Sequence, residues 1–307
     1  MKDNKEEFPF VSVIIPCYND ERGIVDTLES LAKQDYPEGR WETIVVDNNS
    51  TDNSVGVVHS FRGLIPSLKI EREGRQSSYA ARNKGISVSR GEILAFVDAN
   101  VTIWNGWIRR GIASIMKGYD YVGCRVDVYT AQQAANLWEI HDMLTSFPSR
   151  VSWDQWGFAV TAGLFVRRKV FDHVGLFDSR LVSGGDLEFG NRVKDAGIKQ
   201  YYDHDNPVSH PARSDLRSCC CRAFRIGRGH SDLGFFYRKR SFSCPIRFDD
   251  LRYVVRSFFP SFGILRYVDV SELHGRHRLG IWLVSYIMQL AHVSGILFSR
   301  IQRRVTS

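Results

Sequence analysis

Short apolar runs alternate with amphipathic segments along the first 116 residues of the chain. The apolar runs are rich in β-branched residues and end at polar or turn-forming residues, which predicts buried strands. These strands are expected at residues 10–16, 43–46, 68–71 and 93–97. Helical spacing of apolar or alanine residues predicts helices at 20–33, 77–89 and 107–116. Strands that alternate with helices indicate an α/β fold, with a mostly parallel central sheet flanked by helices.

Polar residues directly follow three of these predicted strands. They are Tyr18-Asn19-Asp20, Asp47-Asn48 and Asp98-Ala99-Asn100. In open parallel sheets, ligands bind in the crevice outside the carboxyl ends of the strands. We therefore expect the three polar segments to converge on one binding crevice.

The pattern changes from about residue 153 onward. A strand is expected at 158–167, helices at 169–174 and 186–196, and a last strand region between 201 and 208. Beyond residue 215, arginine-rich helical segments dominate. A chain of 307 residues has room for two domains. We expect an α/β domain over residues 1–215 and a helical, basic C-terminal region over residues 216–307.

Charge is unevenly distributed along the chain, whose formal net charge is +7. Residues 216–307 contain 15 arginines and one lysine against five acidic residues, which indicates an anionic partner for this region. Residues 279–299 contain no Asp, Glu, Lys or Arg and are long enough to cross a bilayer, although polar residues interrupt them. A membrane span, a buried helix and an interfacial helix against anionic lipid all stay open.

Composition and cysteine usage exclude several classes of protein. Hydrophobic residues make up 43% and charged residues 24%, as in ordinary globular proteins, so a disordered tail, a collagen and a small disulfide scaffold are excluded. Three of the six cysteines are adjacent, at 219–221, and no CxxC occurs. This favours reduced thiols and a cytoplasmic setting. A metal cluster at 219–221 is not expected, because His or Cys partners at zinc-finger spacing are missing.

Asp98 and Asn100 place two oxygen donors one residue apart, just beyond a predicted strand. Mg²⁺ is commonly held by one or two such groups together with substrate phosphates, so the pair suits a metal–diphosphate complex. Capping of the next turn is the simpler alternative. Neither GxxxxGK[ST] nor GxGxxG follows the first strand, which argues against a P-loop NTPase or a dinucleotide dehydrogenase.

A further acidic residue, Asp186, follows two glycines at the start of a predicted helix. Gly184 and Gly185 allow a ligand to approach the backbone closely. An aspartate at such a position can take a proton from an acceptor hydroxyl as a general base. The structural alternative makes Asp186 the N-cap of the helix, with Glu188 in its first turn.

Five motifs occur in a fixed order between residues 10 and 215. They are VSVIIPCYN at 11–19, VVDNNSTD at 45–52, AARNKG at 80–85, FVDAN at 96–100 and GDLE at 185–188. Taken together and in this order, they resemble the motifs of family 2 inverting glycosyltransferases of the GT-A fold. The resemblance implies a nucleotide-diphosphate-sugar donor, a divalent Mn²⁺ or Mg²⁺ ion, and an acceptor hydroxyl on a polysaccharide or lipid-linked glycan.

The resemblance also implies roles for particular residues. Asp186 matches the catalytic base, and Asp98 and Asn100 match the metal-binding ends of the DxD motif. His210 stands where some members supply a further metal ligand. The residues implied in nucleotide-sugar binding are Pro16, Tyr18, Asn19, Asp47, Asn48, Arg82, Asp98, Ala99 and Asn100. Among them, Tyr18 is expected against the base, Asp47 with Asn48 against the base and ribose, and Arg82 near the diphosphate.

Three positions depart from the family pattern. Asn100 ends the DxD-like motif, which predicts a weaker or different hold on the metal. Gly185 stands where an acid usually precedes the base. Asn48 stands where the second aspartate of an Asp-Asp pair is usual.

The expected function is an inverting glycosyltransferase that adds one sugar, since the QxxRW motif of processive members is not evident. We expect it in the cytoplasm, at the inner face of the cell membrane if the C-terminal region makes a peripheral contact there. One alternative is a catalytically inactive protein that binds a nucleotide sugar. Another is a nucleic-acid-binding protein that uses aromatic residues among the C-terminal arginines. No nucleic-acid partner is expected under the leading hypothesis.

Overall fold

The computed structural model describes residues 8–65, 67–147, 149–237, 251–260 and 275–306. Contacts between residues divide the chain into two compact units. The first, called the sheet unit here, consists of Met1–Asp127, Ser149–Arg180 and Gly185–His210. The second, called the helical unit, consists of Val128–Pro148, Leu181–Gly184 and Pro211–Ser307. The expected domain boundary near residue 215 stays a prediction, because compactness alone does not identify independently folding domains.

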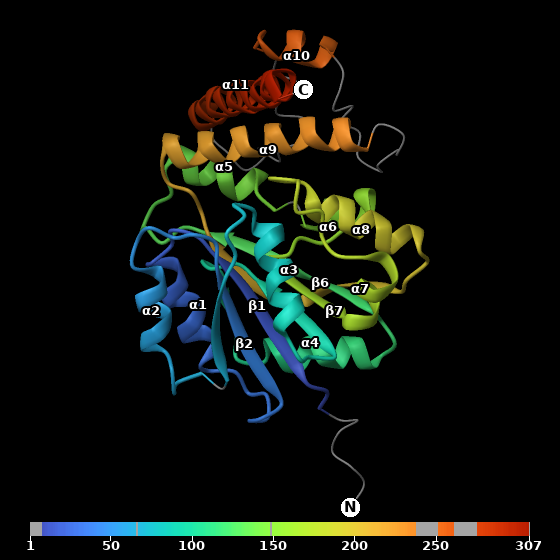
Figure 1. The fold of residues 1–307 in the computed structure, drawn as a ribbon. Coiled ribbons are helices and arrows are strands. Elements are labelled where there is room, and N and C mark those ends of the chain that lie inside the picture. Colours follow the sequence, from blue (N-terminus) through green and yellow to red (C-terminus); the bar gives the residue numbers. More distant parts are fainter. Residues whose placement is uncertain (1–7, 66, 148, 238–250, 261–274, 307) are drawn as a thin grey trace, which may run out of the picture. The chain divides into compact units, whose positions relative to one another are not determined.

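An eight-stranded sheet forms the centre of the sheet unit, with the strand order β3-β2-β1-β4-β7-β6-β8-β5 (Figure 1). The strands are β1 Val11–Cys17, β2 Trp41–Asp47, β3 Leu68–Arg72, β4 Ile93–Val97, β5 Thr102–Ile103, β6 Tyr121–Tyr129, β7 Gly163–Arg167 and β8 Gln200–Pro211. Strands β3, β2, β1 and β4 pair in parallel. This half of the sheet confirms the predicted α/β fold.

The register of the parallel strands brings their carboxyl ends together. Cys17, the last residue of β1, pairs with Asp47, the last residue of β2. On the other side of β1, Ile14 pairs with Phe96 of β4. Every residue of β2 and β4 is buried, as expected for strands that are covered on both faces. The polar segments after these strands therefore start at one edge of the sheet.

The other half of the sheet is antiparallel. β7 runs antiparallel to both β4 and β6, and β5 runs antiparallel to β8. The sequence did not predict β6. It predicted a strand over 158–167, but β7 begins only at Gly163, because Gly157 has a φ of 66° and a turn occupies 161–162.

Seven helices of the sheet unit fall within the described residues. They are α1 Gly23–Leu31, α2 Ser54–Ser60, α3 Ser78–Val88, α4 Trp107–Met116, α6 Ser149–Trp156, α7 Arg168–Val174 and α8 Gly185–Asp195. The bounds of α4 are those predicted from the sequence. α3 packs against β1 and β2 (Figure 1). Its Gly85 permits this approach, since a Cβ atom there would lie 2.5 Å from Cγ2 of Ile14.

The helical unit contains α5 Leu137–Thr145, α9 Leu216–Phe236, α10 Leu251–Ser257 and α11 Gly275–Thr306. α9 and α11 lie against each other through glycines: a Cβ atom on Gly227 would overlap the carbonyl oxygen of His292, and one on Gly295 that of Phe224. Within α11, His277–Val305 is long and apolar enough to cross a membrane by length and composition, with a mean hydropathy of 1.6. Of its most apolar window, 39% is buried in the protein, and one helix of this kind is weak evidence for a membrane span.

The cysteines within the described residues are free thiols. Cys17, Cys124 and Cys219 are buried, and Cys220 and Cys221 are partly or fully exposed. The sixth cysteine, Cys244, lies outside the described residues. The expectation of reduced thiols agrees with the described positions.

Candidate active site

The loops that follow β1 and β2 are joined by hydrogen bonds. Asn19, at a φ of 48°, donates its backbone N–H to Ser50 Oγ at 3.0 Å. Its side-chain oxygen accepts from the backbone N–H of Thr51 at 2.7 Å. Tyr18, the residue before it, is 50% exposed. The two loops thus form one fixed surface from which the Tyr18 ring projects, and Asn19 is largely used in holding that surface together.

Asp47 and Asn48 occupy the end of β2, and both are buried. Asp47 Oδ1 accepts from the backbone N–H of Ser50 at 3.0 Å. The amide of Asn48 donates to the carbonyl oxygens of Glu73 and Arg75 at 2.8 and 2.7 Å, and its oxygen accepts from the N–H of Ser77. A carboxylate cannot donate these two bonds. The asparagine at position 48 therefore holds the loop that leads into α3, which gives this departure from the family pattern a structural reason.

Arg82 of α3 lies between two of the predicted acidic residues. The guanidinium is buried, and its Nη2 donates to Asp98 Oδ1 at 2.6 Å. Burial acts to lower the pKa of Arg82, but the charges of Asp98 and Asp186 outweigh it and the net shift is upward. Arg82 Nε is buried and has no hydrogen-bond partner in the described part of the chain. The Arg82 cation thus interacts with Asp98, which follows β4, and with Asp186 on α8.

Asp186 is the second residue of α8, and its carboxylate is held in place. Its Oδ1 accepts a hydrogen bond from Thr161 Oγ1 at 3.0 Å. The preceding residue, Gly185, donates its backbone N–H to the Tyr79 hydroxyl at 2.9 Å. A Cβ atom on Gly185 would lie only 2.6 Å from the Tyr79 ring, so no larger side chain fits there without a shift. Packing against Tyr79 explains why glycine replaces the usual acid at this position.

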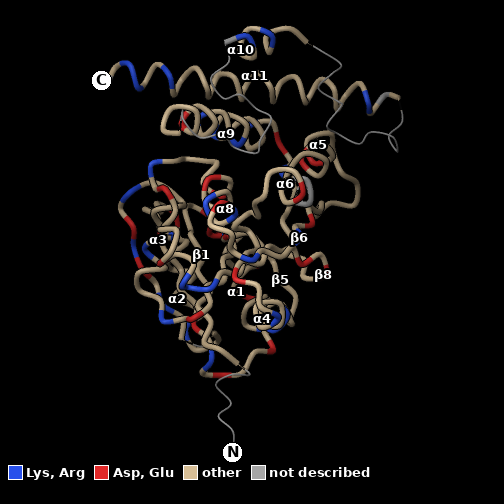
Figure 2. Tube along the Cα trace, turned by 90° about the vertical axis from the view of Figure 1, so that its right-hand side faces the viewer, with Lys and Arg blue, Asp and Glu red and all other residues tan. Residues whose placement is uncertain are grey.

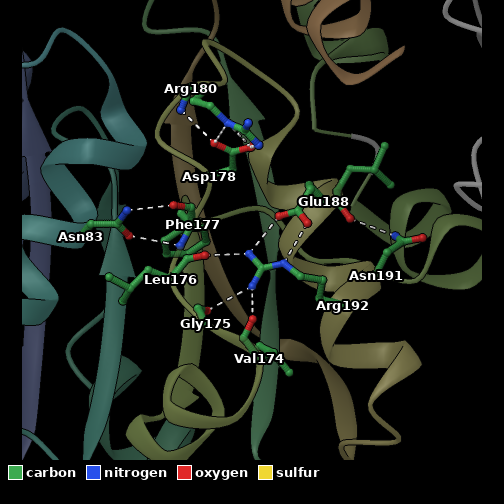
Figure 3. A network of polar contacts seen from close by, with 11 residues as sticks. Asn83, Val174, Gly175, Leu176, Phe177, Asp178, Arg180, Glu188, Asn191 and Arg192 are labelled. Carbon is green, nitrogen blue, oxygen red and sulfur yellow. Dashed lines mark hydrogen bonds and ion pairs between the residues drawn. The ribbon is translucent and has the colours of Figure 1, made fainter. Parts of the chain in front are cut away.

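A short loop after α7 connects α3 to α8, and Figure 3 shows its contacts. Asn83, next to Arg82 on α3, exchanges two hydrogen bonds with the backbone of Phe177, at 2.8 and 3.1 Å. Arg192 of α8 donates to the carbonyl oxygens of Val174, Gly175 and Leu176. It also pairs with Glu188, one turn earlier on α8. The 174–177 loop therefore fixes the helix that carries Arg82 relative to the helix that carries Asp186.

The oxygen donors near the end of β4 suit a divalent metal. Asp98 is 31% exposed at its side chain, and its Oδ2 has no bonding partner among the described residues. Asn100 is half-buried. Two such donors, completed by substrate phosphates, are a usual arrangement for Mg²⁺. The donor chemistry therefore fits the metal that the sequence predicted.

His210 lies at the end of β8, where it is buried. The preceding residue, Ser209, pairs with Thr102, so His210 comes close to the segment that follows Asp98-Ala99-Asn100. Within the described residues, no group of three His, Cys, Asp or Glu side chains gathers to hold an ion. A role for His210 as a metal ligand stays a prediction.

Several residues of the site region were not singled out from the sequence. Tyr79, Asn83 and Arg192 act through backbone atoms of residues that are distant in the chain, for which the sequence carries no local signal. Thr161 lies in a turn before β7 and meets Asp186 across 25 residues. Two surface hollows, of about 340 and 290 Å³, are lined by residues such as Arg62 and Glu29 and include none of the predicted site residues.

A parallel sheet with acidic residues at its carboxyl edge and a further acid at the start of α8 is the arrangement expected of a sugar-nucleotide-dependent transferase. Residues 12–175, more than half of the chain, match the model of glycosyl transferase family 2. The chain belongs to this family and is a glycosyltransferase. Glycosyltransferase AglE of Haloferax volcanii is 38% identical over 223 residues, which cover 72% of this chain and 73% of the relative.

Other relatives and solved structures agree with this assignment. A dolichyl N-acetyl-alpha-D-glucosaminyl phosphate 3-beta-D-2,3-diacetamido-2,3-dideoxy-beta-D-glucuronosyltransferase of Methanococcus voltae is 24% identical and covers 76% of each chain. The mannosyltransferase PcManGT of Pyrobaculum calidifontis, solved with GDP-Man and Mn²⁺, matches with a TM-score of 0.65 and 16% identity over 95% of this chain and 88% of that one. Residues 1–349 of TarS from S. aureus, solved with UDP-GlcNAc, match with a TM-score of 0.57 and 17% identity over 97% and 92%. The predicted GT-A fold is confirmed.

Proposed function

We propose that this glycosyltransferase moves one sugar from a nucleotide-diphosphate sugar to an acceptor hydroxyl, with inversion at the anomeric carbon. The observation that carries the proposal is the shared position of Asp98 and Asp186 around the Arg82 guanidinium. The Asp98 carboxylate suits a metal–diphosphate complex, and the Asp186 carboxylate suits a general base. Both interact with the same cation, that of Arg82. GDP-Man and UDP-GlcNAc, with which PcManGT and TarS were solved, belong to the same class of compound.

The donor is proposed to lie along the carboxyl edge of the parallel strands. Tyr18, which projects from the joined loops, faces the base, with Pro16, Asn19 and Asp47 beside it. Asn48 keeps the loop leading into α3 in position through its amide. Arg82 offers its free Nε to the diphosphate. The segment Asp98-Ala99-Asn100 then meets the phosphates that carry the sugar.

Asp98 and Asn100 are the residues proposed to hold Mn²⁺ or Mg²⁺, with His210 as a further ligand. When bound, the ion neutralises charge on the departing nucleoside diphosphate. Arg82 adds positive charge at the same place, and its position does not depend on the ion, since α3 and the 174–177 loop hold it. The chain therefore contributes both the ligands and a fixed cation.

Asp186 is proposed as the general base. It takes the proton of the acceptor hydroxyl while that oxygen forms a bond to the anomeric carbon and the bond to the diphosphate oxygen breaks. A single displacement of this kind inverts the anomeric centre. The hydrogen bond from Thr161 fixes the position of this carboxylate.

Replacement of the base tests this proposal. Asp186→Asn keeps the shape and the bond from Thr161 but cannot accept the proton, so transfer should fall by about 10²- to 10⁴-fold, while donor binding changes little. Asp172→Asn, on the exposed face of α7, is the matched control and should keep full activity. Near-wild-type turnover by Asp186→Asn would contradict the assignment of the base.

The donor and the metal can be identified together by thermal shift. UDP-, GDP- and dTDP-sugars are added with and without Mn²⁺ or Mg²⁺, since a ligand that binds the native state raises the melting temperature. A donor that protects only with the metal supports the roles of Asp98 and Asn100. Protection without transfer to any acceptor would favour the alternative of an inactive nucleotide-sugar-binding protein.

The acceptor is proposed to be a polysaccharide or lipid-linked glycan reached from the cytoplasmic face of the membrane. α11 exposes a series of large apolar side chains: Leu279, Leu283, Phe298, Ile301 and Val305. Figure 2 shows basic residues near both ends of this helix, among them Arg303 and Arg304 in its last turn. Apolar side chains flanked by arginine suit a peripheral contact with anionic lipid. The name of the M. voltae relative, which includes a dolichyl phosphate, is consistent with a lipid-linked acceptor.

A further inference from the structure

Two arginines of the helical unit meet a single carboxylate, that of Asp142 on α5. Arg213, which precedes α9, donates its backbone N–H to Asp142 Oδ2 at 3.0 Å and its Nη1 to the same oxygen at 3.2 Å. Arg222 of α9 reaches the carboxylate only at a distance, with its Nη1 4.0 Å from Asp142 Oδ1. That oxygen already accepts a hydrogen bond from Ser146 Oγ at 2.6 Å. The Asp142 carboxylate thus accepts hydrogen bonds from Arg213 and Ser146 but none from Arg222.

Arg222 is partly buried and lacks hydrogen bonds. Its side chain is 19% exposed, and it forms no hydrogen bond with any residue in the described part of the chain. A guanidinium carries five N–H donors, and those of Arg222 are left for an acceptor from outside the protein. Burial, followed by the charge of Arg213, lowers the pKa of Arg222 to about 10, so it stays charged at neutral pH. The geometry leaves a recessed cation without an acceptor.

The neighbouring histidine does not add to the charge or supply an acceptor to Arg222. Burial and then the charge of Arg222 lower the pKa of His141 to about 4, so it is neutral near pH 7. Its Nδ1 lies 3.4 Å from Thr145 Oγ1. The cluster thus holds two cations against one anion, a net charge of +1. A bound monoanion, or one ionised oxygen of a larger anion, would balance this net charge.

We propose that Arg213 and Arg222 form a binding site for a phosphoryl group. The planar N–H groups of arginine match the tetrahedral oxygens of phosphate and bind them in pairs, most strongly where water is largely excluded. The phosphate oxygens would accept the N–H donors of Arg222 that the protein leaves unused. The site lies wholly within the helical unit and goes beyond the proposed transfer reaction, because it needs neither Asp98 nor Asp186. The same chemistry serves a free phosphate or the phosphate of a lipid headgroup.

The test uses the full chain and inorganic phosphate as the probe, with chloride at equal ionic strength as the reference. Phosphate should raise the melting temperature of the wild type. Arg222→Gln, which removes the charge and the paired donors, should weaken phosphate binding by about tenfold or more. Arg225→Gln is the matched control for charge, since Arg225 is exposed on the same helix and its charge also acts on Arg222. It should keep the protection by phosphate within about twofold of the wild-type affinity.

The phosphate-free arm separates a ligand site from a structural role. An arginine that lacks partners costs stability, so Arg222→Gln in chloride should melt at the wild-type temperature or above it. A lower melting temperature in chloride, with equal phosphate effects on wild type and variant, would mean that Arg222 serves the fold and would overturn the proposal. Equal protection of both proteins would likewise show that phosphate binds elsewhere, for example at the nucleotide-sugar site.

Vesicles distinguish the two sources of the phosphoryl group. Flotation with phosphatidylcholine vesicles, with and without phosphatidic acid, is compared for wild type, Arg222→Gln and Arg225→Gln. Binding to phosphatidic acid that Arg222→Gln alone weakens supports a lipid headgroup at the site. Protection by inorganic phosphate that depends on Arg222, together with vesicle binding that does not, supports a free phosphate. If neither probe distinguishes Arg222→Gln from Arg225→Gln, the proposal is wrong.

Discussion

Charged side chains around the site of the sheet unit form short hydrogen bonds, whereas Arg222 of the helical unit has only one distant ion pair. Glu42 of β2 is fully buried and accepts hydrogen bonds from Ser12 at 2.7 Å and Lys69 at 2.8 Å. Arg192 satisfies its guanidinium with Glu188 and three carbonyl oxygens (Figure 3). By contrast, Arg222 of the helical unit shares one carboxylate at 4.0 Å. The charged groups of the sheet unit are thus fixed by hydrogen bonds, while Arg222 of the helical unit keeps N–H donors that an outside anion can accept.

Histidines show the same difference in another form. His230 and His292, on α9 and α11, lie with their Nδ1 and Nε2 atoms 2.8 Å apart. Burial lowers the pKa of both, so they are neutral and share one proton-bearing contact. A buried pair of this kind is stable only when uncharged. Acid should therefore affect the helical unit more than the sheet unit, whose buried carboxylate Glu42 has a lowered pKa and stays ionised when paired.

The largest expected effect comes from removing a partner in the sheet unit. Asp98→Ala leaves the Arg82 guanidinium, 5% exposed at its side chain, without the carboxylate at 2.6 Å. An unpaired buried charge of this kind costs about 3 kcal/mol of unfolding free energy. Loss of a proposed metal ligand should also remove most transfer activity. Urea unfolding measures the first effect, and a donor-transfer assay measures the second.

Asp120→Ala is the control for that comparison. Asp120 pairs with Arg167 and Lys169 at 3.1 and 2.9 Å, but the lysine is 67% exposed. Its loss should cost no more than about 1 kcal/mol and leave activity intact. Equal destabilisation by Asp98→Ala and Asp120→Ala would show that the Arg82–Asp98 ion pair contributes no more to stability than an ion pair near the surface.

The second prediction concerns positioning within the sheet unit. Arg192→Ala removes the bonds that hold the 174–177 loop to α8, so Asp186 should lose its fixed place relative to Arg82. A displacement of about 1 Å can lower a rate about 10²-fold, and the fall is expected in kcat more than in KM. Steady-state kinetics measure the two separately.

Arg180→Ala is the matched control for Arg192. Arg180 also pairs with a carboxylate, but the partner is Asp178, two residues earlier in the same loop, and its own side chain is 53% exposed (Figure 3). It should leave kcat within about twofold of the wild type. Arg192→Lys retains the charge without the planar donors and should restore activity only in part. An unchanged kcat in Arg192→Ala would rule out a positioning role.

How far the sequence predicts the structure depends on whether the signal is local. The helix at 107–116 was predicted with its observed bounds, because its apolar residues recur at helical spacing. β6 was missed, because it is defined by antiparallel pairing such as Gly123 with Leu164, 41 residues apart. The structural alternative that made Asp186 the N-cap was wrong, since α8 already begins at Gly185 and Asp186 is its second residue.

The same distinction applies to the site. The strand-end segments around Asp47 and Asp98 were predicted, because each apolar strand and the polar residues that follow it are adjacent in the sequence. The reasons for Asn48 and Gly185 were not predictable, since both depend on distant partners: the carbonyl oxygens of the 73–75 segment and the Tyr79 ring. In the helical unit, the excess of arginine was evident, but the shortage of acceptors at Arg222 appears only when α5 and α9 are packed together.

The smallest expected effect is a pH dependence that comes from His141 in the helical unit. Its pKa is lowered to about 4 when folded, by burial and by Arg222, with Asp142 acting in the opposite direction. The ordinary value is about 6.5 in the unfolded chain, so between pH 6.5 and 4 the unfolded state binds more protons than the folded state. Stability from this group is therefore complete above pH 6.5 and falls by about 1.4 kcal/mol for each pH unit below it.

His141→Asn removes this titration and therefore tests whether His141 causes the pH dependence. Urea curves at pH 7, 6, 5 and 4.5 give the free energy of unfolding. For the variant it should fall less steeply with acid than for the wild type, and the difference in slope should correspond to about one bound proton. The remaining slope comes from other groups, including the buried His230–His292 pair. Because the loss arises in the helical unit, hydrogen exchange should increase in α5 and α9 before it does in β1 and β2. Identical slopes for wild type and variant would mean that His141 is as easily protonated in the folded protein as in the unfolded chain.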